Sequence, residues 1–351
     1  MPKTLDSYLA DRALTRQLYL MRFSAGEKKK VLAVLVTMRA ELVAKLRAGD
    51  VTDFARGRLQ KLLTQCEAVI DHGYGQIQTT LDFEGLAKVE AEATIRPLAA
   101  VGLDATLPTV AAMKALVNGS IFGAPSSAWW SRQSDDLQFK FGNAVRQGVA
   151  QGESMQDIIR RVFGSKRLGT QGIGFPAETL RRNASALVHS SVMQIAADAR
   201  MAVFQANADI LKGVRFLATL DSHTSLRCIA LSGAEWDLSG NPIKGNFPFQ
   251  SPPLHFNCRS VLTAITKSYA ELGRPDIPEV PKGTRASDEG QIPADTTFTS
   301  FLGRKTVAEQ NEMLGVGRAD LWRKGTITLS DLLNFNGNPL TLRQLRDKYL
   351  P

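Results

Sequence analysis

The chain has 351 residues, of which 43 are Lys or Arg and 34 are Asp or Glu, so its formal net charge is +9 at pH 7. A hydrophobic fraction of 44% and a charged fraction of 22% are ordinary globular values and exclude a wholly disordered chain. Three cysteines are too few for a disulfide scaffold, and the longest clean apolar run, residues 31–36, is far shorter than the ~20 residues that cross a bilayer. We therefore expect two or three domains in a reducing compartment and no membrane contact.

The positive charge gathers at the two ends of the chain. Residues 1–50 hold ten basic and five acidic side chains, and residues 298–351 hold eight and five. Such an excess suits contact with phosphate groups or an acidic protein surface, but it is equally found in basic proteins that bind no polyanion. The charge alone therefore does not decide whether the protein binds DNA.

The first hundred residues are predicted to be helical. Ser24 and Glu27 have the spacing of a capping box, which predicts a helix start, and one apolar stripe then ends at Gly49. A second helix is expected from Thr52 or Asp53, forming an antiparallel pair with the first. Cys66 lies on its apolar stripe, which favours a buried small side chain over a metal ligand.

Helices also dominate the middle of the chain. After a break rich in Gly and Pro, apolar spacing predicts a helix through residue 149, Ser154 with Asp157 predicts the start of another, and residues 178–208 predict a third. Residues 213–220 and 261–265 have the composition of β-strands.

Together these elements predict an α+β protein that is mainly α-helical. We divide it into a helical N-terminal region, a connector, a core that ends in a Cys/His module of strands and loops, a proline-rich linker and a helical C-terminal tail. The boundaries are 1–97, 98–128, 129–272 with the module at 213–266, 273–297 and 298–351.

The most informative segment lies between residues 221 and 259. Cys228, His255 and Cys258 bring two thiols and an imidazole together within 31 residues, and these are ligands that Zn²⁺ favours. A closed site needs four ligands, and Asp221 or His223 could supply the fourth. Because the segment is short of apolar residues, we expect the metal to replace a missing core. The alternative is a set of buried thiols without a metal.

Two enzymatic interpretations use the same residues. His255, Asn257 and Asp221 could hold a metal that cleaves phosphodiesters, and a cysteine beside His255 could act as a nucleophile. The sequence offers neither a second acidic cluster nor a third group at an identifying spacing. We therefore predict no catalytic residue, no organic cofactor and no small-molecule substrate.

The same segment resembles the signature of the phage Mu F-like head morphogenesis (minor capsid) family. That family shows D-x-x-T-C-x-x-C-x-x-x-x-G followed by P-P-x-H-x-x-C-R, and this chain has Asp221, Thr224, Cys228 and Gly233 followed by residues 252–259, PPLHFNCR. Ser225 stands where the family has its first cysteine. Further similarity in the tail, from Phe301 to Leu342, extends the resemblance over about residues 130–350.

This resemblance implies a minor head protein of a tailed phage or prophage, without catalytic activity, that acts in procapsid assembly and in genome packaging or delivery. Its expected partners are the portal protein, the major capsid protein or both, and packaged double-stranded DNA. Its expected location is the virion head, in the capsid interior or at the portal vertex, after assembly in the host cytoplasm. The alternative is a DNA-binding protein or metal-dependent nuclease that acts on the phage genome.

Overall fold

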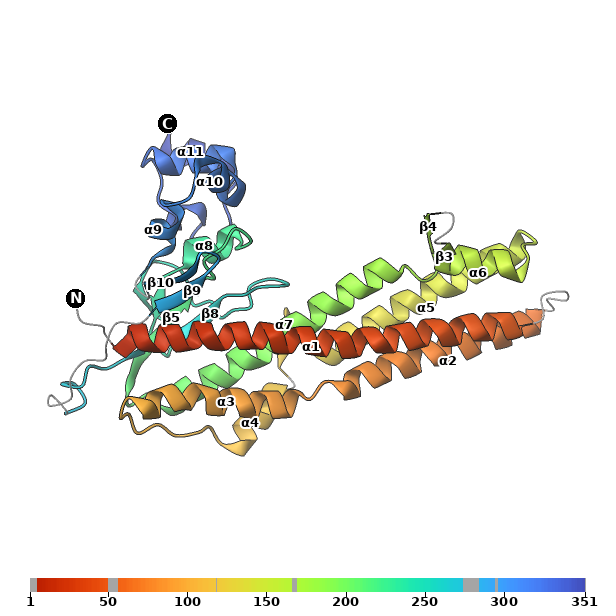
Figure 1. Cartoon of the computed structure of the whole chain (residues 1–351), viewed down its shortest axis with the longest axis horizontal. Coiled ribbons are helices and arrows are strands. Elements are labelled where there is room, and N and C mark those ends of the chain that lie inside the picture. Colours follow the sequence, from red (N-terminus) through yellow and green to blue (C-terminus); the bar gives the residue numbers. More distant parts are fainter. Residues whose placement is uncertain are drawn as a thin grey trace. The chain divides into compact units, whose positions relative to one another are not determined.

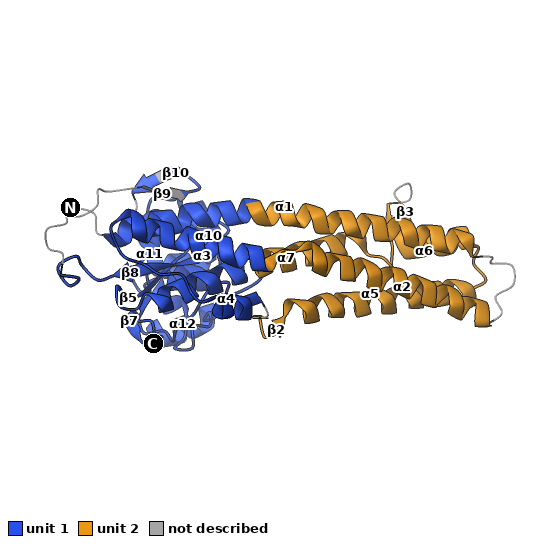
Figure 2. Cartoon of the chain, turned by 90° about the horizontal axis from the view of Figure 1, so that it is seen from below, with its two compact units in different colours: residues 1–22, 84–117, 192–351 blue, residues 23–83, 118–191 orange. Residues whose placement is uncertain are grey.

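The computed structural model describes residues 5–49, 56–117, 119–165, 169–273, 284–293 and 296–350. Helices dominate and the strands form small antiparallel sheets, which confirms the predicted α+β, mainly α-helical class (Figure 1). The chain divides into two compact units (Figure 2): unit 1 holds residues 1–22, 84–117 and 192–351, and unit 2 holds residues 23–83 and 118–191. The division of the chain proposed from its sequence stays a prediction.

The first helix, α1 (Leu5–Ala48), begins well before the predicted start at Ser24. Ser24 is fully buried inside this helix, where its Oγ lies 3.1 Å from Nδ1 of His189. Glu27 is also buried and pairs with Lys30. The prediction of a helix start was therefore wrong, because a buried polar pair on the inner face of a long helix imitates the spacing of a capping box. The predicted end is confirmed, since α1 stops at Ala48.

Unit 2 is built from helices that each bury one apolar stripe. Its core joins residues 31–46 of α1 and residues 180–188 of α7 (Ala177–Ala206) to three shorter helices. These are α2 (Arg56–Thr80), α5 (Ser126–Ala150) and α6 (Met155–Phe163). Cys66 is fully buried in this core, as predicted. The predicted start of the second helix at Thr52 or Asp53 lies outside the described residues.

Short hairpins and caps connect these helices. The hairpin of β1 (Ser120–Ile121) and β2 (Ala124–Pro125) precedes α5, and that of β3 (Gly164–Ser165) and β4 (Thr170–Gln171) follows α6. Ser154 accepts a hydrogen bond from the Asp157 amide at the start of α6, which confirms the predicted N-cap. The third predicted helix is α7 (Ala177–Ala206).

Unit 1 centres on a four-stranded antiparallel sheet of order β7-β6-β5-β8. The strands are β5 (Leu211–Leu217), β6 (Glu235–Trp236), β7 (Pro242–Lys244) and β8 (Val261–Thr266), of which β5 and β8 match the predicted strands. All six residues of β8 are buried, so both of its faces are covered. Other unit 1 elements are α3 (Phe83–Ala100), α4 (Val110–Val117) and α8 (Leu226–Leu231).

The expectation that the segment at residues 221–259 lacks a core is wrong. Leu231, Trp236 and Phe247 are buried in one large apolar cluster with Cys228 and Cys258. The cluster also takes in residues from α3, α7 and the C-terminal tail. The module contains buried apolar residues and also packs against apolar residues from segments distant in sequence. The composition of a short segment cannot reveal these distant contacts.

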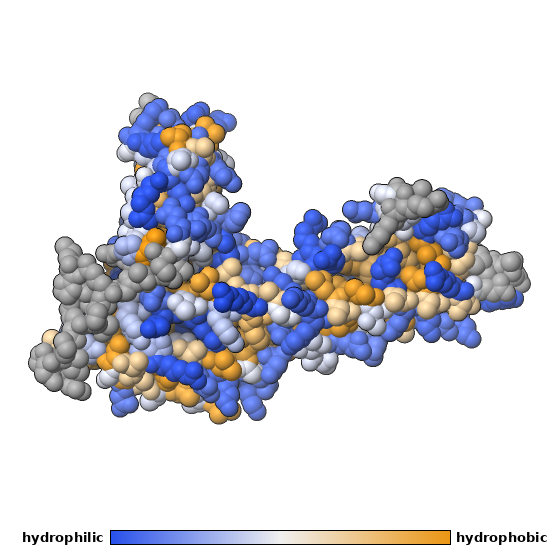
Figure 3. Space-filling view, in the orientation of Figure 1, coloured by the Kyte–Doolittle hydropathy of each residue, from blue (hydrophilic) through white to orange (hydrophobic). Residues whose placement is uncertain are grey.

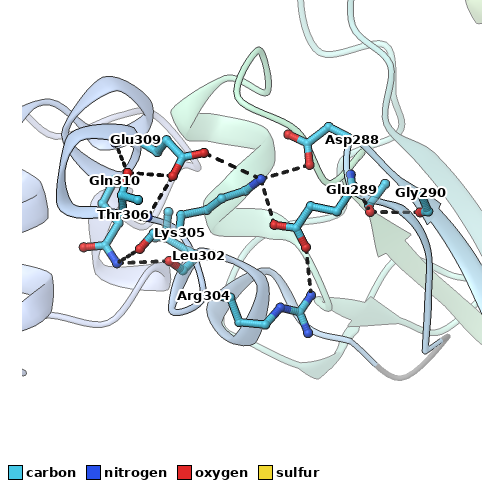
Figure 4. A network of polar contacts seen from close by, with 10 residues as sticks. Asp288, Glu289, Gly290, Leu302, Arg304, Lys305, Thr306, Glu309 and Gln310 are labelled. Atoms are coloured by element: carbon cyan, nitrogen blue, oxygen red, sulfur yellow. Dashed lines mark hydrogen bonds and ion pairs between the residues drawn. The ribbon is translucent and has the colours of Figure 1, made fainter.

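The C-terminal tail of unit 1 is mainly helical, as predicted. It comprises α9 (Phe298–Leu302), α10 (Val307–Leu314), α11 (Val316–Arg323), a 3-10 turn η1 (Ser330–Leu332) and α12 (Leu342–Tyr349). Within the segment expected to be a linker, β9 (Thr284–Ser287) and β10 (Gly290–Pro293) form a hairpin. Lys305 reaches three carboxylates, those of Asp288 and Glu289 in the hairpin turn and of Glu309 in α10 (Figure 4).

The surface of the described residues is mixed in character. On the face drawn in Figure 3, hydrophobic residues form small patches between hydrophilic ones. Among the described residues, none of the helices combines the length and the apolar character that crossing a membrane requires.

Candidate metal centre

The candidate centre joins α8 to the loop that leads into β8. Cys228 lies in the first turn of α8, whose N-cap Ser225 accepts a hydrogen bond from the Cys228 amide. In the loop, the Cys258 amide donates to the carbonyl of His255 over 3.1 Å, closing a tight turn. Asn257 has a positive φ of 62°, a backbone conformation that Asn tolerates better than most residues. This turn directs the side chains of His255 and Cys258 to one side.

The three predicted ligands converge. Nε2 of His255 lies 3.5 Å from Sγ of Cys228, and the two sulfurs lie 3.7 Å apart. All three ligand atoms lie within 4.8 Å of one another. In a tetrahedral zinc site, bonds of about 2.3 Å to sulfur and about 2.0 Å to nitrogen place two sulfurs about 3.8 Å apart and a sulfur and nitrogen about 3.5 Å apart. The Cys228–Cys258 and Cys228–His255 pairs therefore have the spacing that a tetrahedral zinc site requires.

Nε2 of His255 is the ring nitrogen that is available to bind a metal. Its Nδ1 lies 2.9 Å from the carbonyl oxygen of Phe256. A carbonyl only accepts, so Nδ1 carries the proton and Nε2 of the neutral ring keeps its lone pair. A backbone carbonyl on the outer nitrogen is the usual arrangement behind a metal-bound histidine.

The two buried thiols shift each other's pKa in opposite directions. The contact with Cys228 and, after it, the hydrogen bond with His255 lower the pKa of Cys258 to about 4, against the opposing effect of burial. The same contact, with burial, raises the pKa of Cys228. The hydrogen bond to Cys258 raises the pKa of His255. The lowered pKa favours the thiolate form of Cys258, the form that binds metals.

Asp221 lies beside this cluster but is engaged elsewhere. Its carboxylate forms a two-point ion pair with Arg259, with an Nη2–Oδ1 distance of 2.7 Å. The same carboxylate accepts from the amide of His223 and the hydroxyl of Thr224. Asp221 thus orders the loop before α8. The choice of fourth ligand stays a prediction.

Ser225 and Arg259, which were not among the predicted ligands, also lie at the site. Ser225 Oγ lies 2.9 Å from Nε2 of His255, and Arg259 links Asp221 to the residue next to Cys258. A small pocket of about 10 Å³ adjoins the cluster, roughly the space that one water molecule occupies. Ser225, Cys228, His255 and His223 all line it. The sequence signal that could have identified Arg259 is its place directly after Cys258.

Comparison with known proteins shows that part of the chain is similar to one family. Residues 140–263 match the family model described as Phage Mu protein F like protein. The match runs from within α5 into β8, contains Cys228, His255 and Cys258, and confirms the resemblance over this part of the chain. The similarity expected in the tail lies beyond it and stays a prediction. No curated protein and no solved structure matches the chain.

Proposed function

We propose that this chain is a minor head protein of a tailed phage or prophage. It acts in procapsid assembly and in genome packaging or delivery, through contacts with portal or coat protein. The observation that carries this proposal is the family match over residues 140–263, which includes the three converging side chains. The protein has no catalytic role in this proposal.

The helices and the charge of the chain support such a role. The long helices α1, α2 and α5 each have exposed positions beside their buried stripe, and these could contact another protein. The net charge of +9 suits a position close to packaged DNA. The cluster of buried thiols suits a structural centre, because its sulfurs are closed off from substrate.

Co-assembly tests this proposal directly. The full chain is expressed with the portal and coat proteins encoded beside it, and procapsids are isolated by sedimentation. We expect the chain to sediment with procapsids and to be captured by purified portal or coat protein, with a tail protein of the same phage as control. Absence from procapsids together with equal capture by the tail protein would overturn the proposal.

We further propose that Cys228, His255 and Cys258 hold Zn²⁺. Bound there, zinc would tie α8 to the loop before β8 and so fix the two parts of the module. Of the two candidates for the fourth ligand, His223 borders the small pocket, whereas both oxygens of Asp221 accept from Arg259. We therefore favour His223. Elemental analysis should give one zinc per chain, lost in Cys258→Ser and retained in the distant control Cys66→Ser.

One observation favours the alternative of a nuclease. Three protein ligands beside a small polar pocket are the arrangement of catalytic zinc sites, whereas structural sites are closed by four ligands. Nicking of supercoiled plasmid with Mg²⁺, Mn²⁺ or Zn²⁺ tests it. Nicking that disappears in His255→Ala would favour the nuclease, and intact plasmid under all three metals would remove it.

A further inference from the structure

A second polar site lies in unit 1, away from the candidate metal centre. A cavity of about 40 Å³ opens between α1, α3, α7 and β8. Most of its wall is apolar, with Leu9, Leu98 and Phe204 among the lining residues. The polar and charged residues of its lining are Arg12, Arg16, Arg200, Glu90, Thr94 and Thr263.

The charges in this cavity do not balance. Glu90 is fully buried and accepts from Nε of Arg16 over 2.7 Å and from Nη2 of Arg200. Arg200 is also buried, while Arg12 is exposed and lies over the ring of Tyr8. Two guanidinium groups thus pair with Glu90, and the three arginines and one carboxylate of the lining residues give a formal excess of two positive charges.

Two buried polar atoms of the cavity are left unpaired. Nη2 of Arg16 and Oγ1 of Thr263 have no hydrogen-bond partner among the residues that the structure describes. Thr263 is only 1% exposed, so its hydroxyl cannot turn to bulk solvent. A buried donor without a partner costs about 1–3 kcal/mol, and more when it is charged. We therefore expect a hydrogen-bond acceptor inside the cavity, to which Arg16 and Thr263 can donate.

A purely structural role explains this arrangement poorly. A buried ion pair adds little stability over well-packed apolar residues, and a single arginine would neutralise Glu90. The second and third arginines exceed what that carboxylate needs. Guanidinium forks are the side chains best suited to bind planar or tetrahedral oxyanions.

We propose that this cavity binds a small oxyanion, a phosphate or carboxylate group, held by Arg16 and Thr263 with Arg12 at the exposed side. The cavity has room for one such group and not for a nucleotide base or a duplex. The site is separate from the proposed zinc centre and does not depend on it.

Titration with inorganic phosphate tests the proposal. Calorimetry and thermal melting of the full chain are carried out with phosphate, sulfate or acetate, with ionic strength held constant by NaCl. We expect saturable binding and a rise in Tm that NaCl alone does not produce. Binding of phosphate and sulfate alone identifies a tetrahedral anion as the ligand, and equal or tighter binding of acetate identifies a carboxylate.

Three variants separate the site from general charge effects. Arg16→Gln and Thr263→Val should each weaken binding by roughly tenfold, since each removes a hydrogen bond to a charged ligand. Thr263→Val removes a hydroxyl that is unpaired in the free protein, so it should fold normally. Arg96→Gln removes the same charge from an exposed position on α3 and should bind like the wild type. Absent or unsaturable binding in the wild type, or binding as tight as the wild type in both Thr263→Val and Arg16→Gln, would overturn the proposal.

Discussion

Arg259 and Asp221, 38 residues apart in sequence, form a two-point ion pair that joins the two halves of the candidate metal centre. Arg259 follows Cys258 directly, and Asp221 lies four residues before the N-cap of α8, Ser225. The hydroxyl of Thr219 also donates to the carbonyl of Arg259 over 2.9 Å. These contacts fix the separation between the loop that carries Cys258 and the helix that carries Cys228.

Weakening this pair should therefore weaken zinc binding without removing a ligand. Arg259→Lys keeps the charge but loses the two-point geometry, and Asp221→Asn loses the charge. We expect either change to lower zinc affinity by about 10–100-fold, the usual effect of altering residues behind a metal's ligands. Competition with a chromophoric chelator measures this. Arg304→Lys, whose ion pair lies elsewhere, should leave the affinity unchanged, and equal affinity in all three variants would contradict this role.

Removal of zinc should destabilise the protein without unfolding it. The residues around Cys228 and Cys258 belong to a large apolar cluster, which persists when the metal leaves. Zinc at a hundredfold excess over its Kd adds about 2.7 kcal/mol to the free energy of unfolding. We expect EDTA to lower Tm while the far-UV circular dichroism at 25 °C stays unchanged. Complete unfolding in EDTA would show that the cluster cannot hold the module together, and an unchanged Tm would show that no zinc was bound.

Local patterns in the sequence were enough to predict most helices and the convergence of the three ligands. The N-cap at Ser154 and the strand at residues 261–266 follow from neighbouring residues, which is the range over which caps and apolar alternation act. Cys228, His255 and Cys258 converge because one short turn carries two of them and a helix start carries the third.

Features that depend on distant residues were not predictable in this way. The spacing of Ser24 predicts a helix start, but its hydroxyl lies beside His189, which is 165 residues later in the sequence. The segment at residues 221–259 is short of apolar residues, and part of the core against which it packs comes from Phe298, Phe301 and Leu345 in the tail. Likewise, the sequence indicates that Asp221 could bind a metal but does not reveal its pairing with Arg259.

Asp198 should make the protein less stable as the pH rises. Burial within α7 raises the pKa of this carboxyl above its ordinary value of 3.8, although Gln194 donates a hydrogen bond to it. Because the folded pKa is the higher one, stability is fully present below pH 3.8 and declines as the pH rises through the raised value. Asp198→Asn removes the charge and keeps an oxygen that can accept from Gln194.

Thermal melts between pH 3 and pH 8 test this directly. We expect Asp198→Asn to match the wild type at the acidic end and to have the higher Tm near pH 7. The control is Asp136→Asn, an exposed position paired with Lys140, which should show no such gain. A variant with a lower Tm than the wild type near pH 7 would mean that the charge of Asp198 stabilises the fold.

The ion cluster around Lys305 connects the β9–β10 hairpin to the C-terminal helices. The Lys305 side chain is only 9% exposed and lies 2.9 Å from Glu289, 3.1 Å from Asp288 and 4.0 Å from Glu309 (Figure 4). Its ammonium also lies 4.6 Å from the centre of the Phe301 ring. Lys305 is the cation that all three carboxylates share, and Glu289 has a second partner in Arg304 at 3.7 Å.

Lys305→Met should therefore loosen the hairpin. The change leaves carboxylates facing one another without their shared cation, and because these are partly exposed we expect a loss of about 1–3 kcal/mol, below the 3–5 kcal/mol of a fully buried pair. Hydrogen exchange of the amides at residues 284–293 should become faster, and 1 M NaCl should reduce the difference from wild type because salt screens the repulsion. Lys324→Met breaks an exposed pair with Asp320 and should cost at most about 1 kcal/mol. Equal exchange in the two variants would show that the hairpin is held by its apolar contacts, such as that of the buried Ile292, and not by Lys305.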